Sequence, residues 1–144
     1  MAESQDYKTH RMWVPLWHYV ATPIALINLI VALVWLKNGL TFGNIWMVVF
    51  AVGFAATAYL SRVQAVTVQN RLIRLEERLR LREVLPEAMR GRIMDLTVSQ
   101  LIGLRFASDA ELAGLVERCL SGQLGNAEAV KKEIKTWRPD TLRA

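Results

Sequence analysis

The residue with the widest choice of chemistry in this sequence is His18, which stands among aromatic residues near the start of the chain. Trp13, Trp17 and Tyr19 flank it. A neutral imidazole in an aromatic pocket is a suitable axial ligand for haem or a chlorophyll-type pigment. The simpler interpretation is that the imidazole bonds a backbone carbonyl or a lipid headgroup. We therefore expect no cofactor, with ligation of haem or pigment by His18 as the alternative.

No other group of residues forms a recognisable reactive motif. The sequence has 2 histidines, and it lacks a CxxC pair, a phosphate-binding glycine loop and the G-x-S-x-G pattern. Its single cysteine, Cys119, excludes an internal disulfide and is typical of a small buried apolar residue. Asp95 and Asp140 are typical of turn or cap positions. The sequence therefore predicts a protein that is not an enzyme, with no catalytic residue and no metal site.

A long stretch with almost no charged residues indicates the helices that contain His18 and its aromatic neighbours. Residues 12–61 contain one charged side chain, Lys37. The stretch divides into apolar runs at 15–36 and 40–61, each near the roughly 20 residues that an α-helix needs to cross a bilayer. Pro23 predicts a kink in the first helix, where Thr22 or a neighbouring helix can satisfy the freed carbonyl of Tyr19. We predict a transmembrane helical hairpin at 15–61 after a cytoplasmic segment at 1–14.

Basic residues flank the hairpin unequally. Lys8 and Arg11 precede it and a row of arginines follows Ser61, whereas the turn between the spans has only Lys37. The excess of Lys and Arg on the cytoplasmic side of membrane proteins predicts that both termini are cytoplasmic. Basic side chains close to the membrane attract anionic lipid. The predicted contacts for anionic lipid or an acidic partner are Arg62, Arg71, Lys131, Lys132 and Lys135.

Small residues recur at helical spacing in both spans, and small residues let helices approach closely in a membrane. The stripe in the first span is Ala21, Ala25, Asn28 and Ala32. The second span has one stripe of Ala51, Ala55 and Ala58 and another of Gly53, Thr57 and Ser61. One of these two stripes suffices for packing within the hairpin. The other stripe either faces lipid without a specific contact or is a contact face for a partner protein.

The polar pattern remains helical after the second span, so we predict that this helix continues through 62–85. Glu76 and Arg80 have the spacing of a favourable pair along one helix. Apolar residues follow the three-four spacing of a short coiled coil at Ala65, Val68, Leu72, Leu75 and Leu79. Two explanations stay open for this seam: a coiled coil with another chain, or docking on the protein's own C-terminal helices.

Residues 86–144 are predicted to form a small cytoplasmic region of short helices. Thr97 with Gln100, and Ser108 with Glu111, have the spacing of capping boxes. The expected core is Leu101, Leu104, Leu112, Leu115, Val116 and Ile134. No alternating β-branched run indicates a strand, so the fold class is all-α.

Several strings in the sequence resemble one family. They are YKTH at 7–10, PLWH at 15–18, LRFASDAEL at 104–112 and IKTWRPD at 134–140. Together they resemble a family of bacterial two-span membrane proteins of unknown function. The resemblance implies a multi-pass protein of the bacterial inner membrane, and it implies no reaction.

The leading hypothesis is an accessory or scaffold subunit of a larger membrane complex. Its partners would be other membrane-protein subunits and anionic lipids, with a homo-oligomer also possible. A haem or pigment protein using His18 and a lipid-sensing regulatory adaptor are the alternatives. Nucleic acid is not expected, because the arginines of the tail alternate with glutamates and no recognition fold is evident.

Overall fold

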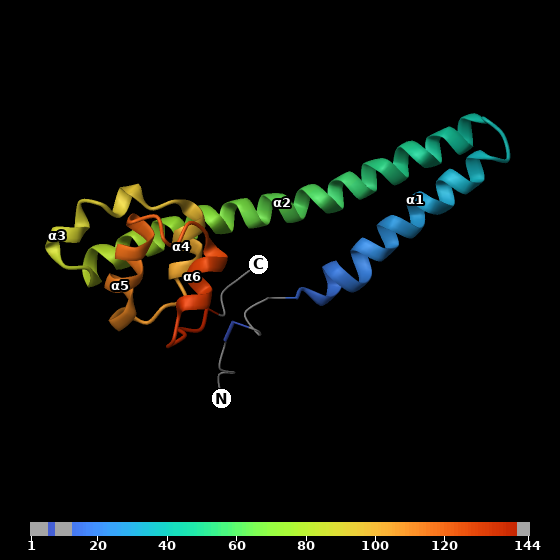
Figure 1. Cartoon of the computed structure of the whole chain (residues 1–144). Coiled ribbons are helices and arrows are strands. Elements are labelled where there is room, and N and C mark those ends of the chain that lie inside the picture. Colours follow the sequence, from blue (N-terminus) through green and yellow to red (C-terminus); the bar gives the residue numbers. More distant parts are fainter. Residues whose placement is uncertain (1–5, 8–12, 141–144) are drawn as a thin grey trace. The chain divides into compact units, whose positions relative to one another are not determined.

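The structure is a computed structural model that describes residues 6–7 and 13–140. The chain is all-helical, as predicted, and within the described residues the only β-type pairing is an isolated bridge between Ala107 and Trp137. It divides into two compact units, one of residues 13–67 and one that begins at Val68 (Figure 1). The elements are η1 (Leu16–Ala21), α1 (Thr22–Leu36), α2 (Phe42–Val84), α3 (Glu87–Arg90), η2 (Ile93–Asp95), α4 (Val98–Leu104), α5 (Asp109–Leu120) and α6 (Ala127–Glu133).

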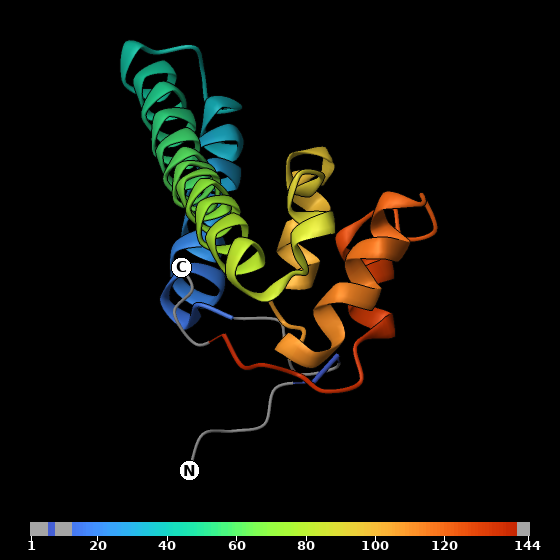
Figure 2. The ribbon, with the colours of Figure 1, turned by 90° about the vertical axis from the view of Figure 1, so that its left-hand side faces the viewer.

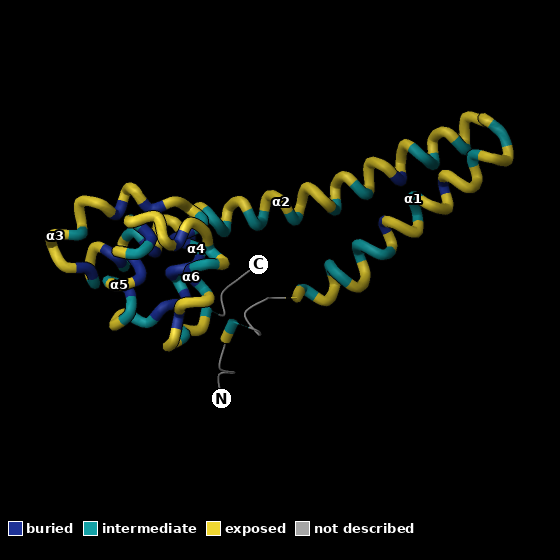
Figure 3. Tube along the Cα trace, in the orientation of Figure 1, coloured by how far each residue is buried: buried dark blue, intermediate teal, exposed yellow. Residues whose placement is uncertain are grey.

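Two helical segments of the first unit are long and apolar enough to cross a membrane: Leu16–Leu36, which joins η1 to α1, and α2. Lys37 ends α1, and the turn passes through Gly39, whose φ of 130° favours glycine. Asn44 Nδ2 donates to the carbonyl of Gly39 at 2.8 Å and fixes the start of α2. Most residues of these segments are exposed within the chain (Figure 3), so their apolar side chains face the surroundings rather than a protein core.

Pro23 is accommodated by a π-helical turn. In η1 the backbone N–H of Thr22 bonds the carbonyl of Trp17, five residues back, and Thr22 Oγ1 donates to the same carbonyl at 2.8 Å. A π-turn absorbs the break in the hydrogen-bond ladder that proline causes. Thr22 Oγ1 therefore bonds the carbonyl of Trp17 rather than the predicted carbonyl of Tyr19, and the Trp17 carbonyl is the one that the N–H of Thr22 already bonds across the π-turn.

The second unit is built around the last turns of α2. Leu81 and Leu85 are buried in one core with residues from α4, α5 and α6. Figure 2 shows the short helices of this unit, in yellow to red, beside the yellow-green end of α2. Every predicted core residue is buried: Leu101, Leu104, Leu112, Leu115, Val116 and Ile134. The core also contains Ile93, Phe106, Leu124 and Val130, which spacing alone did not identify.

α4 and α6 approach most closely at Gly103. A Cβ built there would lie 2.8 Å from Cβ of Val130 and 3.0 Å from the carbonyl oxygen of Ala127. Both are far too close for ordinary packing, so glycine is required at this crossing.

Of the two predicted capping boxes, one is present. Thr97 Oγ1 accepts from the N–H of Gln100, and the Gln100 side chain accepts from the N–H of Thr97, which starts α4. Gln100 is also buried, and its Nε2 donates to the carbonyl of Leu124 at 2.7 Å. The second box, Ser108 with Glu111, is wrong: Ser108 precedes α5 without a side-chain cap bond to its backbone.

Candidate functional site

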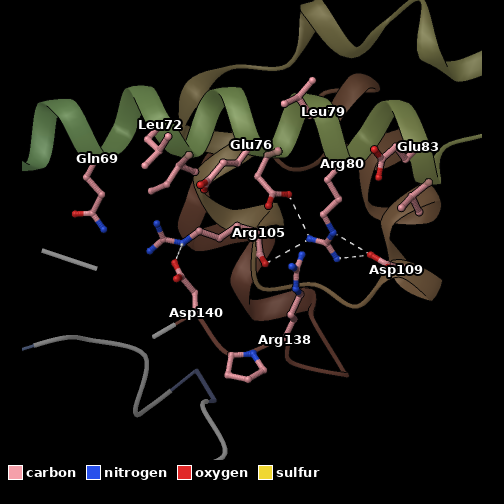
Figure 4. A pocket seen from close by; sticks show the side chains of 14 residues that line it. Gln69, Leu72, Glu76, Leu79, Arg80, Glu83, Arg105, Asp109, Arg138 and Asp140 are labelled. Carbon is pink, nitrogen blue, oxygen red and sulfur yellow. Dashed lines mark hydrogen bonds and ion pairs between the residues drawn. The ribbon is translucent and has the colours of Figure 1, made fainter. Parts of the chain in front are cut away.

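Charged residues meet near the C-terminal end of α2. Glu77 and Arg80 lie on one face of the helix, and their side chains are 7% and 11% exposed. Arg80 Nη1 donates to Glu77 Oε2 at 3.3 Å. Arg80 Nε and Nη2 donate to Asp109 Oδ1 at 2.9 and 2.6 Å. One guanidinium therefore links α2 to the first turn of α5 (Figure 4).

The same guanidinium also binds the backbone between α4 and α5. Arg80 Nη2 donates to the carbonyl of Ala107 at 2.7 Å, and Nη1 lies 3.5 Å from the carbonyl of Arg105. The last carbonyls of a helix have no partner within it, so they need donors from elsewhere. Arg80 supplies such donors at the end of α4.

Glu77 is a buried carboxyl surrounded by arginines. Burial raises the pKa of Glu77, and the positive charges of Arg80, Arg138 and Arg105 oppose this rise. Because the net direction is upward, the folded protein binds a proton at Glu77 more readily than the unfolded chain does.

A groove of about 860 Å³ lies beside this network. α2 lines it together with Arg105, Arg138, Pro139 and Asp140 (Figure 4). Arg105 Nε lies 3.3 Å from Asp140 Oδ2, so Asp140 pairs with a guanidinium and is not only a turn residue. The α2 residues that line the groove are Gln69, Leu72, Ile73, Glu76, Glu77, Leu79, Arg80, Glu83 and Val84. The lining carries both signs of charge, and in this arrangement the charges bind one segment of the chain to another.

Glu111 attaches the segment that follows α6. Its carboxylate accepts from the N–H of Lys135 at 2.9 Å and of Thr136 at 2.7 Å. Desolvation would raise the pKa of Glu111, but these hydrogen bonds outweigh it and lower the pKa. Glu111 also accepts from Ser108 Oγ at 3.4 Å. The N–H of Ser108 bonds the carbonyl of Thr136 at 3.1 Å and not the Glu111 carboxylate, so the second capping box is absent.

The structure also corrects the pairing predicted within α2. Glu76 and Arg80 have the spacing of an ion pair, but Arg80 bonds Glu77 and Asp109. Glu76 is exposed, whereas Glu77 is buried. Spacing along one helix could not show this, because the packing of another part of the chain decides which acid Arg80 meets.

His18 is half-buried between two indole rings. The centroids of Trp13 and Trp17 each lie 4.8 Å from that of the imidazole. His18 Nδ1 lies 2.9 Å from the carbonyl oxygen and 3.1 Å from the amide nitrogen of Val14. A backbone bond is what the simpler interpretation predicts, and it leaves Nε2 as the atom that an iron or magnesium centre would need. Within residues 6–7 and 13–140 no group of acidic, histidine and cysteine side chains is placed to hold a metal ion.

The small-residue stripes differ in burial. In the first span Ala25 and Ala32 are buried, and Ala21 and Asn28 are half-buried. Ala51 is buried in α2, with Ala55 and Ala58 half-buried. The other α2 stripe, Gly53, Thr57 and Ser61, is exposed. Thr57 Oγ1 donates to the carbonyl of Gly53 and Ser61 Oγ to that of Ala58, at 2.9 and 2.8 Å, so these hydroxyls are satisfied by their own helix.

The predicted basic contacts lie in different surroundings. Arg62 Cζ lies 5.7 Å from the ring centroid of Trp17, whose Nε1 donates to the carbonyl of Ala58 at 3.4 Å. Lys131 Nζ lies 5.4 Å from the ring centroid of Phe106. The exposed basic residues of the set are Arg71, Lys132 and Lys135.

Cys119 is buried, and burial raises the pKa of its thiol to about 11. A thiol with so high a pKa is almost entirely protonated at neutral pH and is a poor nucleophile. Its position in the core agrees with the role predicted from the sequence.

The sequence matches one family over residues 1–144. The chain belongs to DUF6526, a family of unknown function. No curated protein and no solved structure matches it. Membership in DUF6526 confirms the resemblance to a family of unknown function, and the role of the residues above is argued from their own geometry.

Proposed function

We propose that this chain is a non-enzymatic accessory or scaffold subunit of a larger complex in the bacterial inner membrane. The observation that carries the proposal is α2, one helix of 43 residues. Its first part is apolar and exposed enough to lie in lipid, and its last turns belong to the core of a helical domain. The same helix therefore contributes both to the candidate membrane segment and to the helical domain.

The side chains of the hairpin support membrane insertion. Large apolar residues are exposed along it, among them Ile30 at 59% and Phe50 at 63%. Aromatic residues occur at both ends of the spans, where their amphipathic rings suit the membrane interface. The arginines after Ser61 favour a topology with both termini in the cytoplasm.

The charged network at Arg80 supports a structural role for the cytoplasmic domain. Its acids and bases are bonded to one another and to backbone carbonyls, so they hold α4 and α5 on α2. The exposed Lys132 and Lys135 lie outside this network and form a basic surface for anionic lipid or an acidic partner. Arg62, beside the ring of Trp17, has the position of an interfacial lipid contact.

Affinity purification of the tagged full chain in a mild detergent, followed by mass spectrometry, tests the proposal. We expect other membrane proteins to co-purify. Lys132→Glu combined with Lys135→Glu should reduce their recovery if the basic surface takes part. Lys37→Glu makes the same type of charge change in the turn between the spans and should leave recovery unchanged. Recovery of only this chain, under conditions that keep known membrane complexes intact, would contradict the proposal.

The surroundings of His18 favour a second candidate, a haem or pigment protein. Ligating histidines commonly bond a backbone carbonyl through the other ring nitrogen, and His18 Nδ1 lies beside the carbonyl of Val14. An absorption spectrum of the purified chain tests this. Absence of a visible band, or a band unchanged by His18→Ala, excludes this candidate.

A further inference from the structure

One face of α2 beyond the candidate span is apolar and uncovered by the described chain. It consists of Val68, Leu72, Leu75 and Leu79, each more than half exposed. Ile73, Glu77 and Leu81, which face the other way, are buried against the domain. The domain therefore does not dock on this seam, although Leu72 and Leu79 reach the edge of the groove. Four large apolar side chains in a regular row are a surface that water disfavours.

We propose that this seam pairs with the same seam of a second copy of the chain, in a parallel two-stranded coiled coil. The seam residues are spaced by four, three and four positions, as at the a and d positions of a heptad repeat. Leu72 and Leu79 occupy a positions, and Val68 and Leu75 occupy d positions. A second copy places each of these side chains against its own counterpart.

The charges beside the seam favour this occupant and this orientation. Arg71 and Arg78 occupy g positions, and Glu76 and Glu83 occupy e positions. In a parallel pair each g residue faces the e residue of the next heptad in the other helix. Arg71 then faces Glu76 of the second copy, and Arg78 faces Glu83 of the second copy. An antiparallel pair would put arginine beside arginine and glutamate beside glutamate.

Arg71, Arg78, Glu76 and Glu83 form no ion pair with one another or with any other residue among 6–7 and 13–140. Arg78 Nε is shielded from solvent and has no hydrogen-bond partner among residues 6–7 and 13–140.

The exposed small-residue stripe of α2 extends the same face. Ser61 precedes Val68 by one heptad, and Thr57 and Gly53 precede Ser61 by four and eight residues. No heavy atom of the described chain lies within 4 Å of a Cβ built on Gly53. In lipid, small residues allow close helix contact, and in water leucines provide the apolar contact. This part of the inference rests on the membrane insertion of the proposed function.

Disulfide cross-linking of the full chain in membranes tests the pairing. Two copies with different tags carry Val68→Cys or Leu75→Cys and are exposed to a mild oxidant. The natural Cys119 is buried and protonated, so background cross-linking is small. Arg74→Cys is the matched control, because Arg74 is exposed on α2 but lies away from the seam. We expect a cross-linked band that holds both tags for Val68→Cys and Leu75→Cys, and roughly tenfold less for Arg74→Cys.

Charge reversal provides a second readout. Arg71→Glu with Arg78→Glu should lower the Leu75→Cys cross-link by roughly tenfold, because all four flanking positions become acidic. Adding Glu76→Arg and Glu83→Arg restores opposite charges and should restore the cross-link. No rescue would overturn the proposed pairing.

The outcomes separate this inference from the proposed function. Equal cross-linking at Arg74 and Leu75, or a cross-link from Leu75→Cys only to another protein, overturns the pairing of two copies. If other subunits co-purify without a band holding both tags, the scaffold role stands and the pairing fails. If the band appears and nothing else co-purifies, the pairing stands and the scaffold role fails.

Discussion

Replacement of Arg80 by methionine tests whether the charged network holds the helical domain on α2. The substitution leaves Glu77, whose side chain is 7% exposed, without its bonded guanidinium. Breaking a buried ion pair in this way costs about 3–5 kcal/mol. The loss of the bonds to Asp109 adds little, because its side chain is 67% exposed and can be hydrated. We expect Arg80→Met to destabilise α4 and α5 by about 3–5 kcal/mol.

A double-mutant cycle separates two contributions to the loss of stability: the lost hydrogen bonds of Arg80 and the unpaired buried charge of Glu77. Glu77→Gln removes the buried charge and should cost about 1 kcal/mol or less by itself, since a neutral amide is cheaper to bury than a carboxylate. In the Arg80→Met background the same change should restore at least about 1 kcal/mol. Arg74→Met is the control, because Arg74 is exposed and makes no ion pair in the part of the chain that the structure describes.

The assay is amide hydrogen exchange of the full chain in detergent, read by mass spectrometry on peptides from α4 and α5 at increasing urea. Local opening free energies come directly from such exchange. A loss below about 1 kcal/mol for Arg80→Met, or no recovery on adding Glu77→Gln, would refute the structural role argued for this network.

The same set of variants tests how the stability of the domain depends on pH. Because the folded pKa of Glu77 lies above its usual 4.5, the folded state is favoured by protonation of this group. Its contribution to stability is fully present below about pH 4.5 and declines as pH rises through the folded pKa. Arg80→Met removes an opposing positive charge, so this decline should become larger. A stability difference between wild type and Glu77→Gln that does not change from about pH 4 to pH 8 would contradict the direction of the shift.

Three further outcomes follow from packing and burial. Gly103→Ala forces a Cβ against Val130 and should destabilise the domain by about 1–3 kcal/mol. The control is Gly114→Ala, whose Cβ meets no heavy atom within 4 Å and which should be neutral or stabilise α5 by up to about 1 kcal/mol. Equal effects of the two substitutions in a urea titration followed by hydrogen exchange would contradict the close approach of α4 and α6. Glu111→Gln should release the segment after α6 at pH 7, and this effect should disappear as pH falls through the lowered pKa of Glu111; exchange rates of the peptide 134–140 measure it. Cys119 should resist maleimide at pH 7 in the folded chain and react after denaturation, and rapid labelling of the folded chain would show that it is not buried.

The residues that could be predicted from the sequence are those whose environment depends on one helix. An apolar run without charge must avoid water wherever it lies, so the candidate spans follow from composition and length. Thr97 and Gln100 bond each other across one helical turn, so their capping box also follows from spacing. The periodicity of the leucines between residues 101 and 116 identified part of the domain core for the same reason.

The second capping box and the Glu76–Arg80 pair failed because other segments competed for the same side chains. Glu111 bonds the backbone of the segment after α6, and Arg80 bonds Glu77 and Asp109. A side chain with several possible partners takes those that packing brings closest, and distant parts of the chain decide this.

By itself, the sequence determined the all-helical class, the two apolar segments, the helix that continues beyond the second of them, and part of the core. These features depend on the spacing of apolar residues along one helix and on whether each helix face is apolar or polar. The tertiary structure alone decided that Glu77 is the buried acid, that Gly103 is needed where α4 crosses α6, and that the seam of Val68, Leu72, Leu75 and Leu79 stays exposed. The reason is that α2 carries apolar residues on two of its faces. Only the packing of α4, α5 and α6 decides which of these faces the domain covers and which stays exposed.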